Sequence, residues 1–265
     1  MTKSAVNYQF LSDNLYETAI EAGRKIMEIY AKDFNVTYKD DASPVTEADE
    51  AAEKIILRDL RQITPDIPII AEEQASSGII PDVGNKFWLV DPLDGTKEFI
   101  KKGSDFTVNI ALIEHGQPTF GIVYAPALSR MFVAKDPNHA IQMNIREGRF
   151  IGPEIPICVR DVPASGITAV ASKSHRDAQT NAFLEKLGVT DIISTGSSLK
   201  FCLVAAGEAD IYPRFGPTME WDTGAGHAVL TAAGGTVVNP DGTCFQYQKP
   251  QFRNGFFIAN GKVVF

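Results

Sequence analysis

Apolar residues recur at helical spacing in two segments near the start of the chain. Between residues 14 and 30 they fall at three- and four-residue intervals, which places them on one face of a helix. A second stripe of this kind begins near Thr46 and continues to Ile63. Thr46 and Asp49 stand three residues apart, the spacing of a capping box. We therefore expect two amphipathic helices, with Thr46 at the start of the second.

Short apolar runs predict strands in the middle of the chain. Two of them, 67–71 and 87–90, have the length of buried strands, and 106–125 has the pattern strand, turn, strand. Further strands are predicted at 131–135 and 140–145, so this part favours antiparallel pairing. Glycine and proline interrupt the pattern over 148–156, which predicts a domain boundary there. The first half is thus expected to comprise residues 1–150.

Helices and strands alternate in the second half, residues 151–265. Strands are predicted at 167–171, 191–194 and 209–212, and helices at 177–187, 197–206 and 223–233. This order indicates a layered α/β unit.

Composition and charge exclude several classes of protein. The 265 residues are 44% hydrophobic, so a large core is available, and the net charge of −8 is unlike that of a nucleic-acid-binding protein. The three cysteines include no CxxC pair, which argues against a disulfide framework or a structural zinc site. No secretory signal and no apolar run of membrane-spanning length is visible. We expect a cytoplasmic protein without an integral membrane segment.

The strongest local signal is a pair of acids at the end of a predicted strand. Asp91 and Asp94 are separated by Pro92-Leu93 and followed by Gly95-Thr96, so a tight turn can direct both carboxylates into one space. Two hard oxygen ligands in such a turn suit Mg²⁺. Alternatively, the segment is a surface turn in which the aspartates cap their own backbone.

Other acids have the same ambiguity. Glu72 and Glu73 follow the predicted strand 67–71, where an acid pair is usually solvated. Asp222 stands where a helix should begin and could be its N-cap. Asp49 could complete the capping box or orient a water near bound metal ions.

Together these segments resemble the inositol monophosphatase superfamily. Its signatures D-P-[IL]-D-G-T and W-D-x-[AG]-[AG] are present, in that order, at 91–96 and 221–225, with the acid pair 72–73 upstream. The resemblance covers nearly the whole chain. It implies an α+β or α/β fold, a layered α-β-α-β-α sandwich of the sugar-phosphatase type, and Mg²⁺-dependent hydrolysis of phosphate monoesters.

The same resemblance assigns roles to individual residues. Asp49 and Thr96 would activate the attacking water, and Gly95 and Thr96 would contact phosphate through the backbone. Two or three Mg²⁺ ions are implied, with Li⁺ as an inhibitor that competes for a Mg²⁺ position. The implied metal ligands are Glu72, Asp91, the Leu93 carbonyl, Asp94 and Asp222.

Within this superfamily the chain is most similar to CysQ-type 3'(2'),5'-bisphosphate nucleotidases. The similarity lies in Lys97-Glu98-Phe99 and in segments 103–112, 121–126, 196–202 and 212–222. The implied substrate is 3'-phosphoadenosine 5'-phosphate, hydrolysed to AMP and phosphate, with 3'-phosphoadenylyl sulfate as a second substrate. This reaction recycles a by-product of sulfate assimilation.

The resemblance also implies a set of substrate contacts, beginning with Ser172 and His175, where Lys173 replaces the family's usual arginine. Lys200 stands in the first turn of the predicted helix 197–206, where a cation opposes the helix dipole. A bound anion would relieve this conflict, whereas the alternative is a lysine that reaches out to solvent. The implied contacts are Glu72, Leu93, Asp94, Gly95, Thr96, Ser172, His175, Gly196, Lys200 and Asp222.

Two alternatives remain at this point. One is another phosphatase of the superfamily that acts on inositol or sugar phosphates, and the other is a non-catalytic nucleotide sensor. In each case the partner is a small phosphorylated molecule and not a nucleic acid. A monomer or homodimer is expected, with peripheral attachment to an inner membrane suggested by some relatives.

Overall fold

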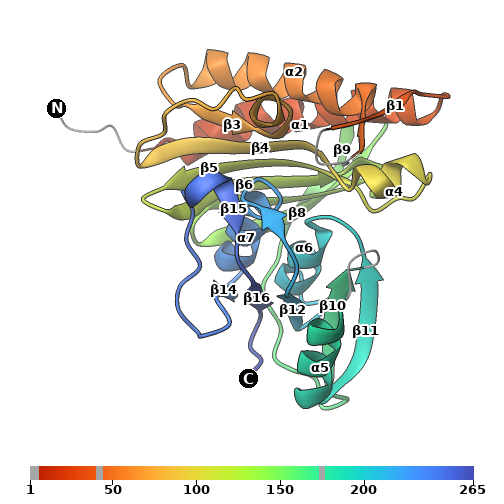
Figure 1. Cartoon of the computed structure of the whole chain (residues 1–265), viewed down its shortest axis with the longest axis vertical. Coiled ribbons are helices and arrows are strands. Elements are labelled where there is room, and N and C mark those ends of the chain that lie inside the picture. Colours follow the sequence, from red (N-terminus) through yellow and green to blue (C-terminus); the bar gives the residue numbers. More distant parts are fainter. Residues whose placement is uncertain (1–5, 40–43, 173–176) are drawn as a thin grey trace.

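The computed structural model describes residues 6–39, 44–172 and 177–265 (Figure 1). Most of the predicted elements are present, and short helices and strands are added to them. The helices are α1 (Tyr8–Tyr30), α2 (Glu47–Ile63), α3 (Glu72–Ser76), α4 (Thr96–Ile100), α5 (Ala178–Lys186), α6 (Leu199–Ala205) and α7 (Gly224–Ala232). Two short 3₁₀ turns, η1 (Pro126–Leu128) and η2 (Pro250–Phe252), accompany them.

The chain adopts the expected layered α-β-α-β-α arrangement (Figure 1). Helices α1 and α2 pair with each other and cover one face of a seven-stranded sheet, and α7 covers the other face. Helix α6 packs against α7 and against a five-stranded sheet, whose outer side carries α5. Helix α1 starts at Tyr8, before the predicted residue 14, because the Asn7 side chain accepts a hydrogen bond from the Phe10 amide at 3.0 Å and caps it.

The seven-stranded sheet is antiparallel except at its first pair, β3 and β4. Opposite Asn109 and Thr107 of the neighbouring strand, β4 carries one extra residue between Asp91 and Asp94. This β-bulge re-aims the side chains that follow the buried part of the strand. In spatial order the strands are β3 (Ile69–Ala71), β4 (Lys86–Asp94), β5 (Thr107–Glu114), β6 (Gln117–Ala125), β7 (Arg130–Asp136), β8 (His139–Arg146) and β9 (Arg149–Pro156).

The boundary predicted at residue 150 falls inside β9, which pairs with β8 and extends the first sheet to Pro156. All eight residues of β9 are exposed, so the strand has no buried face for the sequence to reveal. Gly152 and Pro153 indicate a linker in the sequence, but an edge strand tolerates both. The N-terminal sheet therefore ends at Pro156, beyond the boundary predicted at residue 150.

The five-stranded sheet contains the predicted strands and two C-terminal ones that the sequence pattern did not reveal, β14 and β16. Two separate short pairs, β1 with β2 and β13 with β15, lie outside the main sheets. The order of the five-stranded sheet is β11 (Val189–Thr195), β10 (Ile167–Ser172), β12 (Ile211–Arg214), β16 (Phe257–Asn260), β14 (Thr236–Val238). The short pairs are β1 (Val36–Tyr38), β2 (Pro44–Thr46), β13 (Thr218–Met219) and β15 (Arg253–Asn254).

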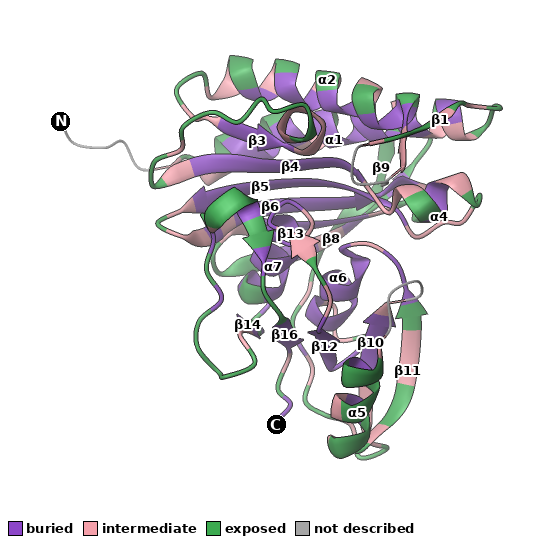
Figure 2. Cartoon of the chain, viewed as in Figure 1, coloured by how far each residue is buried: buried purple, intermediate pink, exposed green. Residues whose placement is uncertain are grey.

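Helices α6 and α7, which lie between the two sheets, are buried along most of their length (Figure 2). Close packing there depends on small residues. A Cβ atom at Gly226 would stand 2.6 Å from the Phe201 ring, and one at Gly121 would stand 2.8 Å from the Ala225 carbonyl oxygen. The start of α7 is therefore held firmly against the seven-stranded sheet and against α6. Within the described ranges no helix combines the length and hydropathy needed to cross a bilayer.

Candidate active site

A cavity of about 570 Å³ lies where the end of β4, the starts of α4, α6 and α7, and the loop after β12 come together. Eight of the predicted site residues line it, although they are distributed over residues 72–222. Asp49, Asp91 and Leu93 are buried directly behind its wall. His175 lies outside the described residues. The predicted residues in the lining are Glu72, Asp94, Gly95, Thr96, Ser172, Gly196, Lys200 and Asp222.

Asp49 completes the capping box and also contacts a residue of the cavity lining. Its Oδ2 atom accepts hydrogen bonds from the amide and the hydroxyl of Thr46, at 2.8 and 2.7 Å, and completes the capping box of α2. Its Oδ1 atom lies 3.1 Å from the hydroxyl of Thr96. Burial raises the pKa of Asp49 to about 6, although hydrogen bonds from Thr46 oppose the shift. One carboxylate thus fixes a helix start and faces a hydroxyl in the cavity wall.

Thr96 is held in place by the turn before it. Gly95 adopts a positive φ of 95°, and a Cβ atom there would stand 2.8 Å from the Asp105 carbonyl oxygen. Only glycine fits this position without strain. The Thr96 hydroxyl also lies 3.2 Å from the Leu93 carbonyl oxygen, so it has two possible acceptors within hydrogen-bonding distance.

Asp91 and Asp94 leave the sheet through the bulge in β4. Asp91 accepts a hydrogen bond from the Leu93 amide at 3.0 Å and is 1% exposed. Burial raises its pKa well above the ordinary range, and the carboxylates of Glu72, Asp94 and Asp222 raise it further, in that order. The ionised carboxylates of these acids therefore repel one another.

Asp94 is hydrogen-bonded directly to a residue in the second half of the chain. Its Oδ2 atom accepts a hydrogen bond from the Ser198 amide at 2.6 Å. The Ser198 hydroxyl donates to Asn109 Oδ1 at 2.6 Å and lies 2.9 Å from the Thr107 hydroxyl. Burial raises the pKa of Asp94 to about 6, against the opposing charge of Lys200.

Glu72 begins the short helix α3, directly after β3. The buried Glu53 carboxylate accepts hydrogen bonds from the Glu73 and Gln74 amides, at 2.8 and 3.1 Å, and so fixes the start of α3. Lys39 lies 2.7 Å from Glu72 and 2.8 Å from Glu73. Burial raises the pKa of Glu73 to about 7, helped by the charge of Glu72.

Asp222 is not the N-cap of α7, as its position suggested; the helix begins one residue later, with Thr223 as the cap residue. The Asp222 carboxylate instead accepts a hydrogen bond from the Met219 amide at 2.7 Å and lines the cavity. Burial raises its pKa well above the ordinary range, with Asp94 and Glu72 adding to the shift. It therefore belongs electrostatically to the group formed by Glu72, Asp91 and Asp94.

This acidic group fits divalent cations in its chemistry. Its donors are carboxylate oxygens, which suit Mg²⁺, and the raised pKa values of Asp91, Asp94 and Asp222 indicate excess negative charge that a cation would balance. Among the described residues, no three His, Cys, Asp or Glu side chains are yet arranged closely enough to ligate one ion.

The cavity lining also has a cationic wall, formed by Lys200 and Arg214. Lys200 is 6% exposed, so it does not reach out to solvent; its ammonium group donates to the Ser197 carbonyl and lies 5.3 Å from the centre of the Tyr212 ring. Burial lowers the pKa of Lys200 to about 8, although Asp94 opposes the shift. Arg214 is equally buried and bonds the Pro217 carbonyl at 3.1 Å, but its Nε atom finds no acceptor among the described residues.

Gly196 and Ser172 border the same cationic wall. The Gly196 amide donates to the Asp105 carboxylate at 3.3 Å, and a Cβ atom at Gly196 would stand 2.7 Å from the Asp105 carbonyl oxygen. Asp105 and Gly196 thus hold two distant loops together at the cavity edge.

Sequence reasoning missed several residues that shape the site. Lys39 and Asn109 reach it only through the fold, and no local pattern marks them. The Ser198 amide, which the sequence suggested as a donor to a bound anion, donates to Asp94 instead. The burial of Arg214, and the lack of an acceptor for its Nε atom within the described ranges, become visible only in three dimensions.

Comparison with known proteins agrees with this geometry. The model of the inositol monophosphatase family matches residues 7–264. The protein named 3'(2'),5'-bisphosphate nucleotidase CysQ of Escherichia coli O157:H7 is 47% identical over 251 residues, covering 93% of this chain and 98% of its own. The CysQ protein of Buchnera aphidicola is 44% identical and covers 94% of this chain and 92% of its own.

Solved structures give the same result. The crystal structure of CysQ from Bacteroides thetaiotaomicron, a bacterial member of the inositol monophosphatase family, superposes with a TM-score of 0.80 at 36% identity. It covers 97% of this chain and 99% of its own. An inositol monophosphatase from Thermotoga maritima superposes with a TM-score of 0.76 at 26% identity, covering 95% of this chain and 92% of its own.

Proposed function

This chain belongs to the inositol monophosphatase family, and on that basis we propose that it hydrolyses the 3'-phosphate of 3'-phosphoadenosine 5'-phosphate to give AMP and phosphate. The similarity to bisphosphate nucleotidases named CysQ, at 46–47% identity over 93% of the chain, supports this substrate class. 3'-Phosphoadenylyl sulfate has the same 3'-phosphate and is a second substrate in this proposal.

The observation that carries the proposal is that one cavity is lined by both acidic and cationic side chains. Asp94 and Asp222 are among the acids, and Lys200 and Arg214 are buried cations of the same lining. A substrate with two phosphate groups can place the scissile one near the acids and the other near the cations. A simple monoester such as an inositol phosphate has no second anionic group for Lys200 and Arg214 to bind.

Mg²⁺ is the proposed cofactor, two or three ions held by Glu72, Asp91, Asp94, Asp222 and the Leu93 carbonyl oxygen. When bound, these ions would neutralise charge on the phosphoryl oxygens and make a water molecule more acidic.

Thr96 and Asp49 are proposed to activate the attacking water by accepting its proton. The Thr96 oxygen would accept a hydrogen bond from the water while its own proton points to Asp49 Oδ1, 3.1 Å away. Asp49 Oδ2 is already engaged by Thr46, so the carboxylate cannot turn away from Thr96 without breaking the capping box. Phosphoryl transfer depends mainly on positioning of this kind. Near the scissile phosphate, the Gly95 and Thr96 amides would contribute backbone donors at the start of α4.

The remaining substrate contacts follow from the same placement. Lys200, Gly196 and Ser172 would contact the nucleotide on the cationic side, with Arg214 adding a donor that is otherwise unpaired. His175 is retained as a proposed nucleotide contact on the strength of its sequence motif. The protein is proposed to act in the cytoplasm on a small phosphorylated nucleotide, as a monomer or homodimer.

A phosphate-release assay with Mg²⁺ tests the proposal. The substrates to compare are 3'-phosphoadenosine 5'-phosphate, inositol 1-phosphate and fructose 1,6-bisphosphate. A preference for the nucleotide by at least about tenfold in kcat/KM is expected, the value of one charge-assisted contact. An equal or greater rate with inositol 1-phosphate would reject the nucleotide assignment and keep the metal site. Binding of the nucleotide without phosphate release would reject catalysis altogether.

A further inference from the structure

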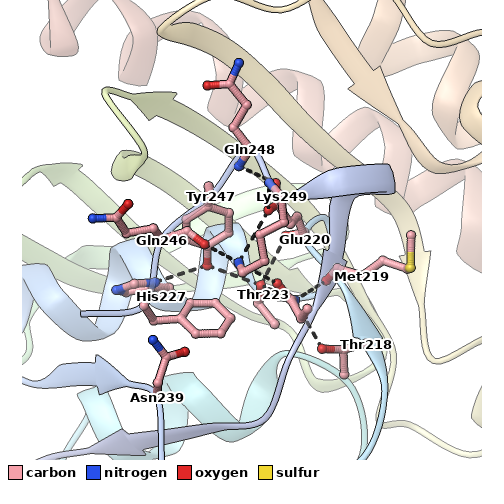
Figure 3. A network of polar contacts seen from close by, with 12 residues as sticks. Thr218, Met219, Glu220, Thr223, His227, Asn239, Gln246, Tyr247, Gln248 and Lys249 are labelled. Atoms are coloured by element: carbon pink, nitrogen blue, oxygen red, sulfur yellow. Dashed lines mark hydrogen bonds and ion pairs between the residues drawn. The ribbon is translucent and has the colours of Figure 1, made fainter. Parts of the chain in front are cut away.

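A buried polar network surrounds Glu220, two residues before Asp222, and Figure 3 shows it with Thr223 and Lys249. At its centre is Glu220, a carboxylate with no exposed surface. Glu220 accepts hydrogen bonds from the Gln248 and Lys249 amides at 2.9 and 2.8 Å, and its carboxylate lies 3.4 Å from the Lys249 ammonium group. A fully buried glutamate is rare unless it is paired in this way.

The backbone of Glu220 is held on both sides as well. Its amide donates to the Phe252 carbonyl at 2.8 Å, which joins it to the same loop that its side chain binds. Its carbonyl accepts from the Thr223 and Gly224 amides, at 3.2 and 2.9 Å, where α7 begins. Every polar group of Glu220 therefore holds the turn of residues 218–224 in place. Asp222 lies in the middle of this turn.

Side chains from the C-terminal loop reinforce the turn. Asn254 donates to the Met219 carbonyl at 2.7 Å and to the Thr223 hydroxyl at 3.1 Å, while its own oxygen lies 3.1 Å from the Lys249 ammonium group. Met219 is also the residue whose amide binds the Asp222 carboxylate, at 2.7 Å. A continuous chain of contacts thus runs from Lys249 to Asp222.

The loop that binds Glu220 has a strained backbone. Gln248, Gln251 and Phe252 adopt positive φ angles of 73°, 57° and 54°, although none of them is glycine. Such conformations persist only where surrounding contacts fix them, and they gather at functional sites. Here the contacts that fix the loop are those of Glu220, whose side chain binds Gln248 and whose amide binds Phe252.

From this arrangement we infer that Glu220, locked by Lys249 and the loop of residues 248–252, is a positioning residue that sets the direction of the Asp222 carboxylate toward bound metal. This inference rests on the proposed function, since it takes Asp222 to be a metal ligand. Glu220 touches neither substrate nor metal in this role; it acts by fixing the turn on which Asp222 is mounted.

The direct test is the affinity of the purified protein for Mg²⁺ in the absence of substrate, measured by titration calorimetry. Mutation of a residue that supports a metal ligand typically lowers metal affinity by about 10- to 100-fold. Glu220→Gln is therefore expected to weaken Mg²⁺ binding by about tenfold. A change smaller than about threefold in a folded Glu220→Gln protein would overturn the inference.

Asp210 provides a matched control. It is also a buried carboxylate, 1% exposed, paired with Arg160 at 2.8 Å and accepting the Thr168 amide at 2.7 Å, but it does not line the cavity. Asp210→Asn is expected to lower the urea midpoint as Glu220→Gln does and to leave Mg²⁺ affinity unchanged. An equal loss of Mg²⁺ affinity in both variants would mean a general structural effect and overturn the inference.

Two further variants keep the test decisive. Should Glu220→Gln not fold, Lys249→Met takes its place, with a loss of Mg²⁺ affinity of at least about threefold expected and an unchanged affinity overturning the inference. Asp222→Asn is the reference for the ligand itself. If Asp222→Asn leaves Mg²⁺ affinity unchanged, the proposed metal site fails together with the inference. If only Asp222→Asn weakens binding, the inference alone fails.

Discussion

The carboxylate of Asp94 accepts a hydrogen bond from the backbone amide of Ser198 at 2.6 Å, although the two residues are 104 positions apart in the sequence. Asp94 ends a strand of the seven-stranded sheet, and Ser198 directly precedes α6, the helix that carries Lys200. A proposed metal ligand and the proposed site for the second phosphate are therefore in direct contact. Binding of the nucleotide's remote phosphate can stabilise the arrangement at the reacting phosphate, which is how remote binding energy contributes to catalysis.

Ser198→Ala tests this connection. The substitution removes the hydroxyl between Asn109 and Thr107 and leaves a buried amide oxygen without its donor, which is expected to cost about 1–3 kcal/mol of stability. Urea unfolding measures the loss. Alanine keeps the amide that binds Asp94, but it removes the hydroxyl contacts that hold this amide in place, so kcat/KM is expected to fall as well. The exposed Ser77 is the control, since Ser77→Ala should change stability by less than about 0.5 kcal/mol. Equal effects of the two substitutions would argue against the connection.

Asp91→Asn is expected to separate activity from stability. Wild-type Asp91 is buried among other acids, so a neutral side chain of the same shape should stabilise the metal-free protein. Activity should fall by more than about 100-fold, because loss of a metal ligand should reduce activity at least as much as loss of a residue that only supports a ligand. Urea unfolding in EDTA and in Mg²⁺ measures both states, and the stabilisation by Mg²⁺ should disappear. A less stable metal-free variant would contradict the crowding of acids described above.

Lys200→Met is expected to affect substrates according to their second phosphate. With 3'-phosphoadenosine 5'-phosphate, kcat/KM should fall about 10- to 100-fold more than with 3'-AMP, which lacks the 5'-phosphate and so the charge-assisted contact. Comparing the two substrates cancels the effect that loss of Lys200 has on nearby Asp94. Steady-state kinetics provide both values. Equal losses with both substrates would place the second phosphate elsewhere.

Stability should decrease in acid because of His227. This residue is fully buried, beside the Tyr247 hydroxyl at 3.1 Å, and burial lowers its pKa to about 3 from the ordinary 6.5. The unfolded chain therefore binds a proton that the folded chain excludes, so stability is present above pH 6.5 and is lost as the pH falls toward 3.

His227→Gln is the variant that isolates this effect. Between pH 7 and pH 5, the drop in unfolding free energy should be about 2 kcal/mol smaller in the variant than in the wild type. Urea unfolding at the two pH values provides the comparison. An identical pH dependence would show that His227 is not the group responsible.

The sequence predicted those parts of the molecule that local periodicity specifies. The stripes of α1 and α2, the central strands and the helices of the second half follow from spacing alone, and the two family motifs pointed to residues that the fold brings to one cavity. Strand β9 was missed because all of its residues are exposed, so no alternation of buried and exposed positions marks it. Strands β14 and β16 are short, and pairing with neighbours makes them strands. Strand β16 pairs with β12, and β14 pairs with β16.

The candidate site was predictable in its residues but not in their surroundings. The apolar sequence around Lys200 indicates a buried helix, but whether its ammonium group reaches solvent depends on how α6 packs between the two sheets. The N-cap role suggested for Asp222 failed for a similar reason, since the Met219 amide competes for the same carboxylate. Local rules identify a residue's options, and tertiary contacts decide among them.

The two oxygens of the Asp49 carboxylate have different partners, and this affects how the activity of the protein responds to heating. One of its oxygens caps α2 and the other faces Thr96, so the first turn of α2 and the Thr96 hydroxyl share a single support. Helix ends fray at lower free-energy cost than whole proteins unfold. Fraying of this helix end would release Thr96 while the sheets stay intact, so warming should extinguish turnover reversibly several degrees before the calorimetric melting transition begins.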